Sequence, residues 1–202
     1  MDLQPIHLPP TSFTKKYLFT TDHKVIAKQF LWGGFLFLII GGGLAMLIRW
    51  QWAFPNQPVP LVGDLFLGAT GGKIAPATYN SIFTNHGLIM IFWAITPLLI
   101  GAFGNFCIPL MIGARDMAFP LLNMLSFWIW VLSAALVLGS FFVPLGAAGA
   151  GWTTYPPLSS NVGMPGAGQS LMVAAIFVIG IYFMMPCDRF LIVYLIKQCG
   201  KG

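Results

Sequence analysis

The feature that most constrains the fold is a run of apolar residues, from position 30 to position 48, that contains no charged side chain. At 1.5 Å per residue, a helix of about 19 residues spans roughly 28 Å, close to the ~30 Å hydrocarbon core of a bilayer. Lys28 and Arg49 flank the run, where charged side chains can reach the headgroups. The sequence predicts an all-α fold, a polytopic membrane helical bundle forming one transmembrane domain over residues 1–202, with about four spans at residues 30–48, 79–103, 121–145 and 170–196.

Composition excludes the main alternatives to a membrane protein. Hydrophobic residues make up 57% of the chain and charged residues only 7%, whereas soluble domains carry about 25% charged residues. The net charge of +5 does not indicate nucleic-acid binding, because the basic residues form no stripe along one face. The three cysteines form no CxxC pair, so we expect reduced thiols and neither a disulfide framework nor a zinc site.

The basic residues predict the orientation in the membrane. With four spans, both termini lie on one side, together with seven basic residues: Lys15, Lys16, Lys24, Lys28, Arg115, Lys197 and Lys201. The other side holds only Arg49 and Lys73. Positively charged loops remain in the cytoplasm, so we expect both termini on the cytoplasmic, or equivalent negative, side.

His86 is the only histidine inside an apolar run. An ionisable group within a membrane span is costly and indicates a functional site, here a ligand for a metal or a haem through one imidazole nitrogen. The alternative is a histidine that only donates a hydrogen bond to a neighbouring helix. The residue alone does not decide between them.

Four strings of residues carry a resemblance to a known family. They are TTDHKVIAKQF, TYNSIFTNHGLIMIFW, GNFCIPLMIGARDMAFPLLNMLSFW and GWTTYPPLS, which cover about residues 20 to 160 in the family's order. Together they resemble the N-terminal part of subunit I of the haem–copper respiratory oxidases (cytochrome c oxidase subunit 1). The resemblance implies an integral protein of a bacterial plasma membrane or a mitochondrial inner membrane.

The resemblance implies a haem role for four residues near the outer surface. His86 matches an axial ligand of the low-spin haem, of type a or b, and Arg49 matches an arginine that contacts a haem substituent. Trp152 matches a residue near the haem propionates, and Tyr155 lies in the same string. From the residues alone, Arg49 could equally be an interfacial anchor and Tyr155 an aromatic-belt residue.

At the inner surface the resemblance implies a proton pathway. Asp116 matches the carboxylate at the mouth of the family's D pathway, and Asn105 and Asn123 match asparagines beside it. A carboxylate can collect protons there, and amides can order a water chain. The alternative for Asp116 is a pair with Arg115 or a cap on the following helix.

Glycines make the first span thin, and two interpretations stay open. Small residues let helices approach closely, or they leave room for a bulky planar cofactor. The residues concerned are Gly33, Gly34, Gly41, Gly42 and Gly43.

The expected function is a contribution to cytochrome c oxidation and O2 reduction in aerobic respiration. The chain ends near the family's fourth helix, so we expect the second axial haem ligand and the copper ligands to lie outside it. By itself it lacks an O2-reducing site. Expected partners are membrane lipid, other oxidase subunits, the rest of subunit I, and cytochrome c or quinol through the complex. Two alternatives are a quinol-oxidising member and a non-catalytic remnant or assembly partner without haem.

Overall fold

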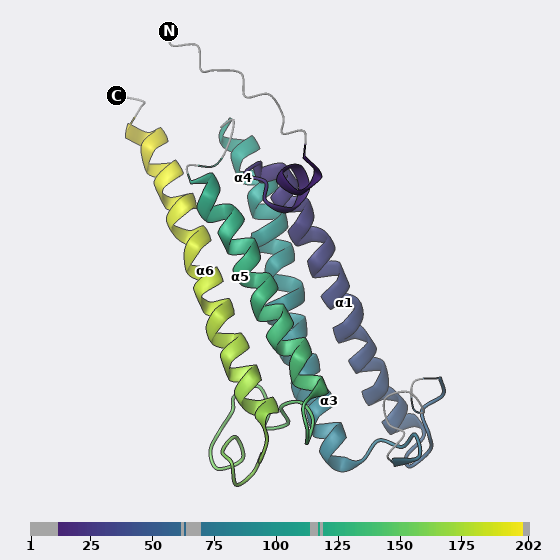
Figure 1. The fold of residues 1–202 in the computed structure, drawn as a ribbon. Helices are drawn as coiled ribbons and strands as arrows, with labels where there is room; N and C mark the ends of the chain where they lie inside the picture. The colour runs from purple at the N-terminus through teal and green to yellow at the C-terminus, as the bar shows by residue number, and fades with distance from the viewer. Residues whose placement is uncertain (1–11, 62, 64–69, 114–116, 118, 200–202) are drawn as a thin grey trace.

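Four long helices run side by side in the computed structural model, which describes residues 12–61, 63, 70–113, 117 and 119–199 (Figure 1). The first span is α1 (His23–Ala53) and the third is α5 (Pro120–Gly139), extended by η5 (Ser140–Phe142). The second span joins α3 (Pro76–Leu88), η3 (Ile89–Ile95), η4 (Pro97–Gly104) and α4 (Asn105–Ile112), and the fourth is α6 (Ala167–Cys199). A short segment, η1 (Thr14–Leu18), precedes them.

The expected fold class is confirmed. The described residues contain no strand, and four helices are long and apolar enough to cross a membrane. Only 22% to 39% of the residues in their most apolar windows are buried, so most of these residues are at least partly exposed. An apolar exterior of this extent needs lipid as its solvent.

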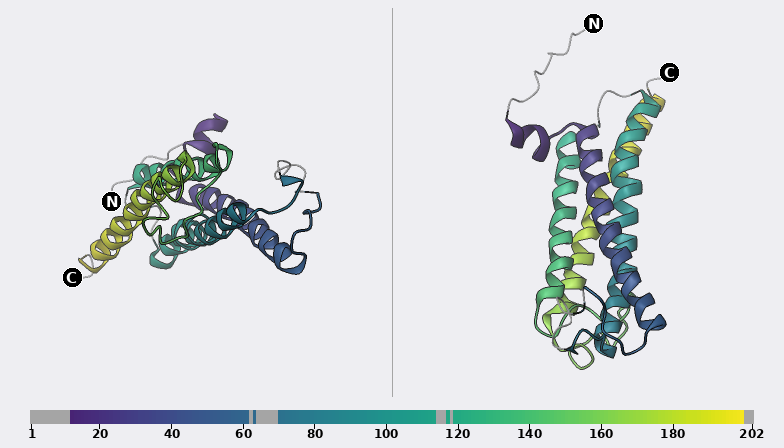
Figure 2. Two further views of the ribbon diagram at one scale, coloured as in Figure 1. Left: turned by 90° about the horizontal axis from the view of Figure 1, so that it is seen from below. Right: turned by 90° about the vertical axis from the view of Figure 1, so that its right-hand side faces the viewer.

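The bundle has two distinct ends. At the terminal end, α1 begins, α4 gives way to α5, and α6 finishes (Figure 1). At the loop end, α1 finishes, α3 begins, and the long connection to α6 folds across the helices (Figures 1 and 2). The N- and C-terminal parts of the chain thus share one end of the bundle, as four spans require.

Local signals explain where the helices begin and stop. The Asp22 carboxylate accepts a hydrogen bond from the Lys24 backbone N–H (2.8 Å) and caps α1. α3 and α5 both have a proline near their first position, where its missing N–H is not needed. The connection expected from residue 104 to residue 120 is shorter in the structure. The apolar residues of α4 extend the helix until Gly113, whose φ of 69° ends it.

Pro97 interrupts the regular pattern of the second span. Proline has no backbone N–H and disturbs the preceding turn. The wider π-helical segment η3 ends at Ile95 and the next one, η4, begins at Pro97 itself. The Thr96 hydroxyl between them donates to the Ile91 carbonyl (2.6 Å). The disturbance therefore takes the form of widened turns, and the helix continues past the proline.

Aromatic side chains from three spans form the centre of the core. Phe30 of α1 lies 5.9 Å from Trp130 of α5 and 5.5 Å from Tyr182 of α6, measured between ring centroids. All three residues are buried. Tilted and edge-on ring pairs of this kind hold α1, α5 and α6 together.

One hydrogen-bonded chain crosses the middle of the bundle. The Trp93 indole N–H of η3 donates to the Ser133 hydroxyl of α5 (3.1 Å), which donates to the Ala175 carbonyl of α6 (2.7 Å). Trp93, Ser133 and Ala175 are fully buried. This chain links the second, third and fourth spans where no water is available to compete.

Candidate functional site

His86 lies on α3 with its imidazole held by the first span. Its Nδ1 is 2.9 Å from the Gly41 carbonyl oxygen of α1. A carbonyl can only accept, so Nδ1 carries the proton and donates it to this bond. In the neutral ring, Nε2 then keeps its lone pair, and it has no hydrogen-bond partner among the described residues. A backbone carbonyl that orients one ring nitrogen while the other stays free is the usual arrangement of a metal-ligating histidine.

The glycines near His86 separate into two groups. A Cβ added at Gly33 would lie 2.5 Å from the Trp130 ring, and one at Gly34 would lie 2.6 Å from Leu98, so these glycines serve close packing. A Cβ added at Gly42, Gly43 or Gly87 would meet no atom within 4 Å. The helix surface beside His86 is therefore open. This open surface and the free Nε2 both fit a bulky planar group.

The loop between α5 and α6 is fastened to α3 one turn before His86. The Ser81 hydroxyl donates to the Ala147 carbonyl (2.8 Å), and the Asn85 amide donates to the Ala148 carbonyl (2.9 Å). The Gly151 backbone N–H donates to the Thr84 hydroxyl (3.0 Å). Small residues make this approach possible, because a Cβ at Gly149 would already lie 3.2 Å from the Ser81 hydroxyl. We refer to residues 147–151 as the docked loop.

Three residues with an expected haem role lie at the loop end. Trp152 directly follows the docked loop and Tyr155 comes three residues later, and both side chains are exposed. Arg49, in the last turns of α1, is also exposed and forms no ion pair with the described residues. All three residues thus lie at the loop end of the bundle. None of them forms a hydrogen bond with His86 among the described residues.

The residues with an expected proton-pathway role lie at the terminal end. Asn105 opens α4, is 3% exposed, and donates its amide to the Gly101 carbonyl (2.7 Å). Asn123, in the first turn of α5, is fully buried, and its backbone carbonyl accepts a hydrogen bond from the Ser126 hydroxyl (2.7 Å). Asp116 lies outside the described residues. The two asparagines therefore share one end of the bundle, opposite Arg49 and Trp152.

The described residues hold no cluster that could bind a metal ion by itself. No group of three or more histidine, cysteine, aspartate or glutamate side chains comes together in this part of the chain. His23 opens α1, 18 residues before the Gly41 carbonyl that holds His86, a separation of about 27 Å along the helix. A metal bound at His86 would therefore lie beyond the reach of His23.

Sequence reasoning missed the residues that position His86. Gly41 acts through its backbone carbonyl, and Ser81, Thr84 and Asn85 act by holding the docked loop. The only available signal was the stretch of small, uncharged residues from 146 to 151, which is typical of close backbone approach.

Comparison with known proteins identifies the family. The family model described as cytochrome c and quinol oxidase polypeptide I matches residues 25–198. The chain belongs to this family. The resemblance expected from the four strings is confirmed.

Relatives from three organisms match most of the chain. Cytochrome c oxidase subunit 1 of Thermostichus vulcanus is 40% identical over 188 residues, which is 93% of this chain and 31% of the relative. The heme-copper oxidase subunit I+III of Aeropyrum pernix is 40% identical over 177 residues, 88% of this chain and 20% of the relative. The alternative cytochrome c oxidase subunit 1 of Bradyrhizobium diazoefficiens is 38% identical, over 89% of this chain and 30% of the relative. The chain thus spans about a third or less of the length of these relatives.

Proposed function

We propose that this chain supplies part of the low-spin haem site of a respiratory oxidase subunit I, with His86 as one axial ligand. The supporting observation is the imidazole geometry, in which the Gly41 carbonyl fixes the tautomer and leaves Nε2 available. The open surface at Gly42, Gly43 and Gly87 provides space beside the ligand. When bound, the haem would supply one-electron transfer in the oxidation of cytochrome c or quinol.

Arg49, Trp152 and Tyr155 have supporting roles in this proposal. All three lie at the loop end, and their side chains are exposed and could contact a haem. A guanidinium beside a haem stabilises negative charge and raises its reduction potential. Indole and phenol groups can donate hydrogen bonds to carboxylates such as propionates.

Asp116, Asn105 and Asn123 are proposed to form the entrance of a proton pathway at the opposite end. Two of these residues are buried amides near the membrane surface, and amides can order water molecules. The proposed orientation puts this end, with both termini, on the negative side of the membrane. The remaining oxidase subunits, the second axial ligand and the copper site would come from outside this chain.

The test is a reduced-minus-oxidised optical spectrum of the purified native complex. We expect the low-spin haem band to be present in the wild type and absent in His86→Ala. His23→Ala is the matched control, since it removes a buried histidine at the start of α1, far from His86, and should keep the band. An unchanged band in His86→Ala would exclude His86 as the ligand. A wild-type complex without any haem would favour a non-catalytic role.

A further inference from the structure

The first span approaches the second very closely at Gly41. Gly41 is buried in α1, and a Cβ added to it would lie 2.7 Å from the Met90 sulfur, 3.0 Å from the Met90 Cγ and 3.2 Å from the Ile89 Cγ2. Atoms of packed side chains normally stay about 3.5–4.0 Å apart. The two helices therefore lie closer together here than a residue with a side chain at this position would allow.

The residues that meet Gly41 belong to the same face of the second span as His86. Ile89 and Met90 follow His86 by three and four residues, which is the spacing of neighbours on one helix face. The Gly41 carbonyl oxygen lies 2.9 Å from the His86 Nδ1. The space left by the missing side chain and the hydrogen bond to the imidazole are therefore neighbouring parts of one contact.

The hydrogen bond to His86 depends on this close approach. Within a regular α-helix, a carbonyl oxygen accepts one N–H from the next turn and keeps a second lone pair for a donor from outside. That donor reaches the oxygen only if the neighbouring helix is near. A shift of α1 by a few tenths of an ångström would stretch the 2.9 Å bond to the upper limit of its usual range, about 3.2 Å.

The side chains opposite Gly41 cannot move aside freely. Met90 is flexible and can turn its sulfur away, but its Cγ moves only if the bond nearest the backbone rotates. Ile89 is fully buried and β-branched, so its Cγ2 is held in place by the core and by a stiff first torsion. A side chain at residue 41 would therefore displace α1 as well as Met90.

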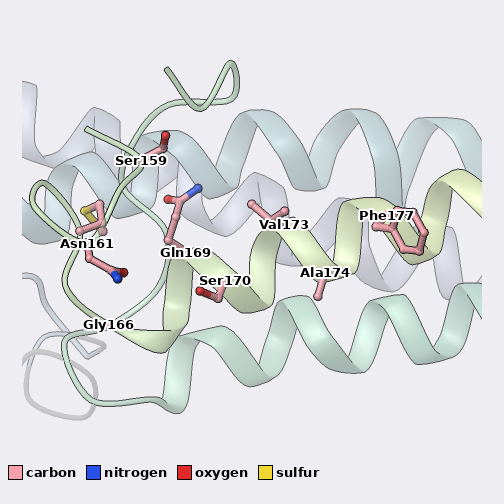
Figure 3. A pocket seen from close by; sticks show the side chains of 9 residues that line it. Ser159, Asn161, Gly166, Gln169, Ser170, Val173, Ala174 and Phe177 are labelled. Atoms are coloured by element: carbon pink, nitrogen blue, oxygen red, sulfur yellow. The ribbon is translucent and has the colours of Figure 1, made fainter. Parts of the chain in front are cut away.

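The cavities at the loop end offer no room beside this contact. One of about 450 Å³ lies between α6 and the loop that precedes it, as Figure 3 shows. Another, of about 1430 Å³, is lined on α1 by residues such as Gly43. Neither of these two cavities is lined by Gly41, Ile89 or Met90. The atoms around Gly41 thus have no space in either cavity to move into.

We propose that Gly41 is a positioning residue whose missing side chain sets the strength of the hydrogen bond to His86, and thereby the reduction potential of the low-spin haem. A strong hydrogen bond at Nδ1 makes the imidazole a more basic ligand. A more basic ligand favours the oxidised iron and so lowers the potential. This inference rests on the proposed role of His86 as a haem ligand.

The experiment is a redox titration of the purified native complex, in which the absorption band of the low-spin haem is followed at a series of fixed potentials. We expect Gly41→Ala to keep the band and to raise the midpoint potential. At the wild-type midpoint, its ratio of oxidised to reduced haem should be at least threefold lower. For a one-electron couple, this ratio corresponds to a shift of about 28 mV.

Gly34→Ala is the matched control. Its added Cβ would lie 2.6 Å from the Leu98 Cγ, so it overpacks the same two spans. It lies seven residues, or about 10 Å, from Gly41 along α1. This variant should unfold more readily than the wild type but keep the wild-type midpoint. A structural role of the glycines alone would weaken both variants without moving either midpoint.

A double variant tests whether the effect passes through Met90. Met90→Ala removes both of the Met90 atoms that the added Cβ would meet. Gly41→Ala/Met90→Ala should therefore bring the midpoint at least halfway back to the wild-type value. If Gly41→Ala alone loses the haem band, the double variant should regain the band, with a midpoint still above that of the wild type.

Three results would overturn the inference. They are a wild-type midpoint in Gly41→Ala, an equal rise in Gly34→Ala, and a double variant that recovers neither the midpoint nor a lost band. Failure of the proposed ligand role looks different, because the low-spin band would then survive in His86→Ala. A band that His86→Ala abolishes, together with an unshifted midpoint in Gly41→Ala, would refute the role of Gly41 alone.

Discussion

The substitution Gly168→Ala should disturb the contact between α6 and the loop that precedes it. A Cβ at this position would lie 2.0 Å from the Gly146 carbonyl oxygen and 3.1 Å from the Ala147 Cα. Both are backbone atoms, so no change of rotamer can relieve the contact. The first turn of α6 must move away from the docked loop, whose Ala147 carbonyl accepts the bond from Ser81.

The size of the effect follows from this geometry. Overpacking costs about 1–3 kcal/mol, and a contact with backbone should reach the upper end of that range, about 3 kcal/mol. Gly180→Ala, in the same helix, is the matched control, because its Cβ would meet no atom within 4 Å. Replacing a helical glycine by alanine without a clash should stabilise by about 0.5–1 kcal/mol. The two variants should therefore differ by about 3–4 kcal/mol, a change of several hundredfold in the unfolding equilibrium.

The assay is reversible unfolding of the purified protein in mixed micelles with a rising fraction of dodecyl sulfate, followed by tryptophan fluorescence. Gly168→Ala should unfold at a lower fraction than the wild type, and Gly180→Ala at an equal or higher one. If both variants unfold together, the first turn of α6 does not lie against the backbone of Gly146 and Ala147, and the close contact at Gly168 is wrong.

Two further substitutions test hydrogen bonds between the spans. Ser133→Ala removes the link that receives the Trp93 indole, and unfolding in the same assay should show a loss of about 0.6–1.7 kcal/mol; no loss would mean that the chain of bonds adds no stability. Thr84→Val keeps the side-chain shape but removes the acceptor of the Gly151 N–H, so amide exchange at Gly151 should rise by about fivefold to tenfold as about 1 kcal/mol is lost. Unchanged exchange at Gly151 would show that another group protects this amide.

The class of fold could be predicted because it depends on long apolar runs, which are visible in the sequence. The ends of the helices could not be predicted, because the prediction ended each span at the nearest charged residue. α1 extends from His23 to Ala53, beyond Lys28 and Arg49, because polar side chains at a membrane surface remain compatible with a helix. The second span likewise runs past residue 103, up to the glycine that ends α4.

The sequence singled out His86 as the candidate ligand but did not indicate the groups that hold its side chain and its helix turn. An isolated histidine in an apolar run is visible in any sequence. Its partner is the Gly41 carbonyl, 45 residues away, and every residue has a carbonyl, so no residue type marks the partner. The docked loop is similar, because its acceptors at Ala147 and Ala148 are also backbone atoms. The glycines allowed two interpretations, which only the packing around each one separates.

The docked loop also sets an order for biosynthesis. Its bonds to α3 join residues 63 to 67 positions apart, so the ribosome completes the third span before they can form. Until then, the turn of α3 that carries His86 has its contact with Gly41 but lacks its second fastening. The hydrogen bonds that fasten this turn of α3 therefore form late, and any group that binds at His86 meets the finished geometry only after residues 147–151 have been synthesised.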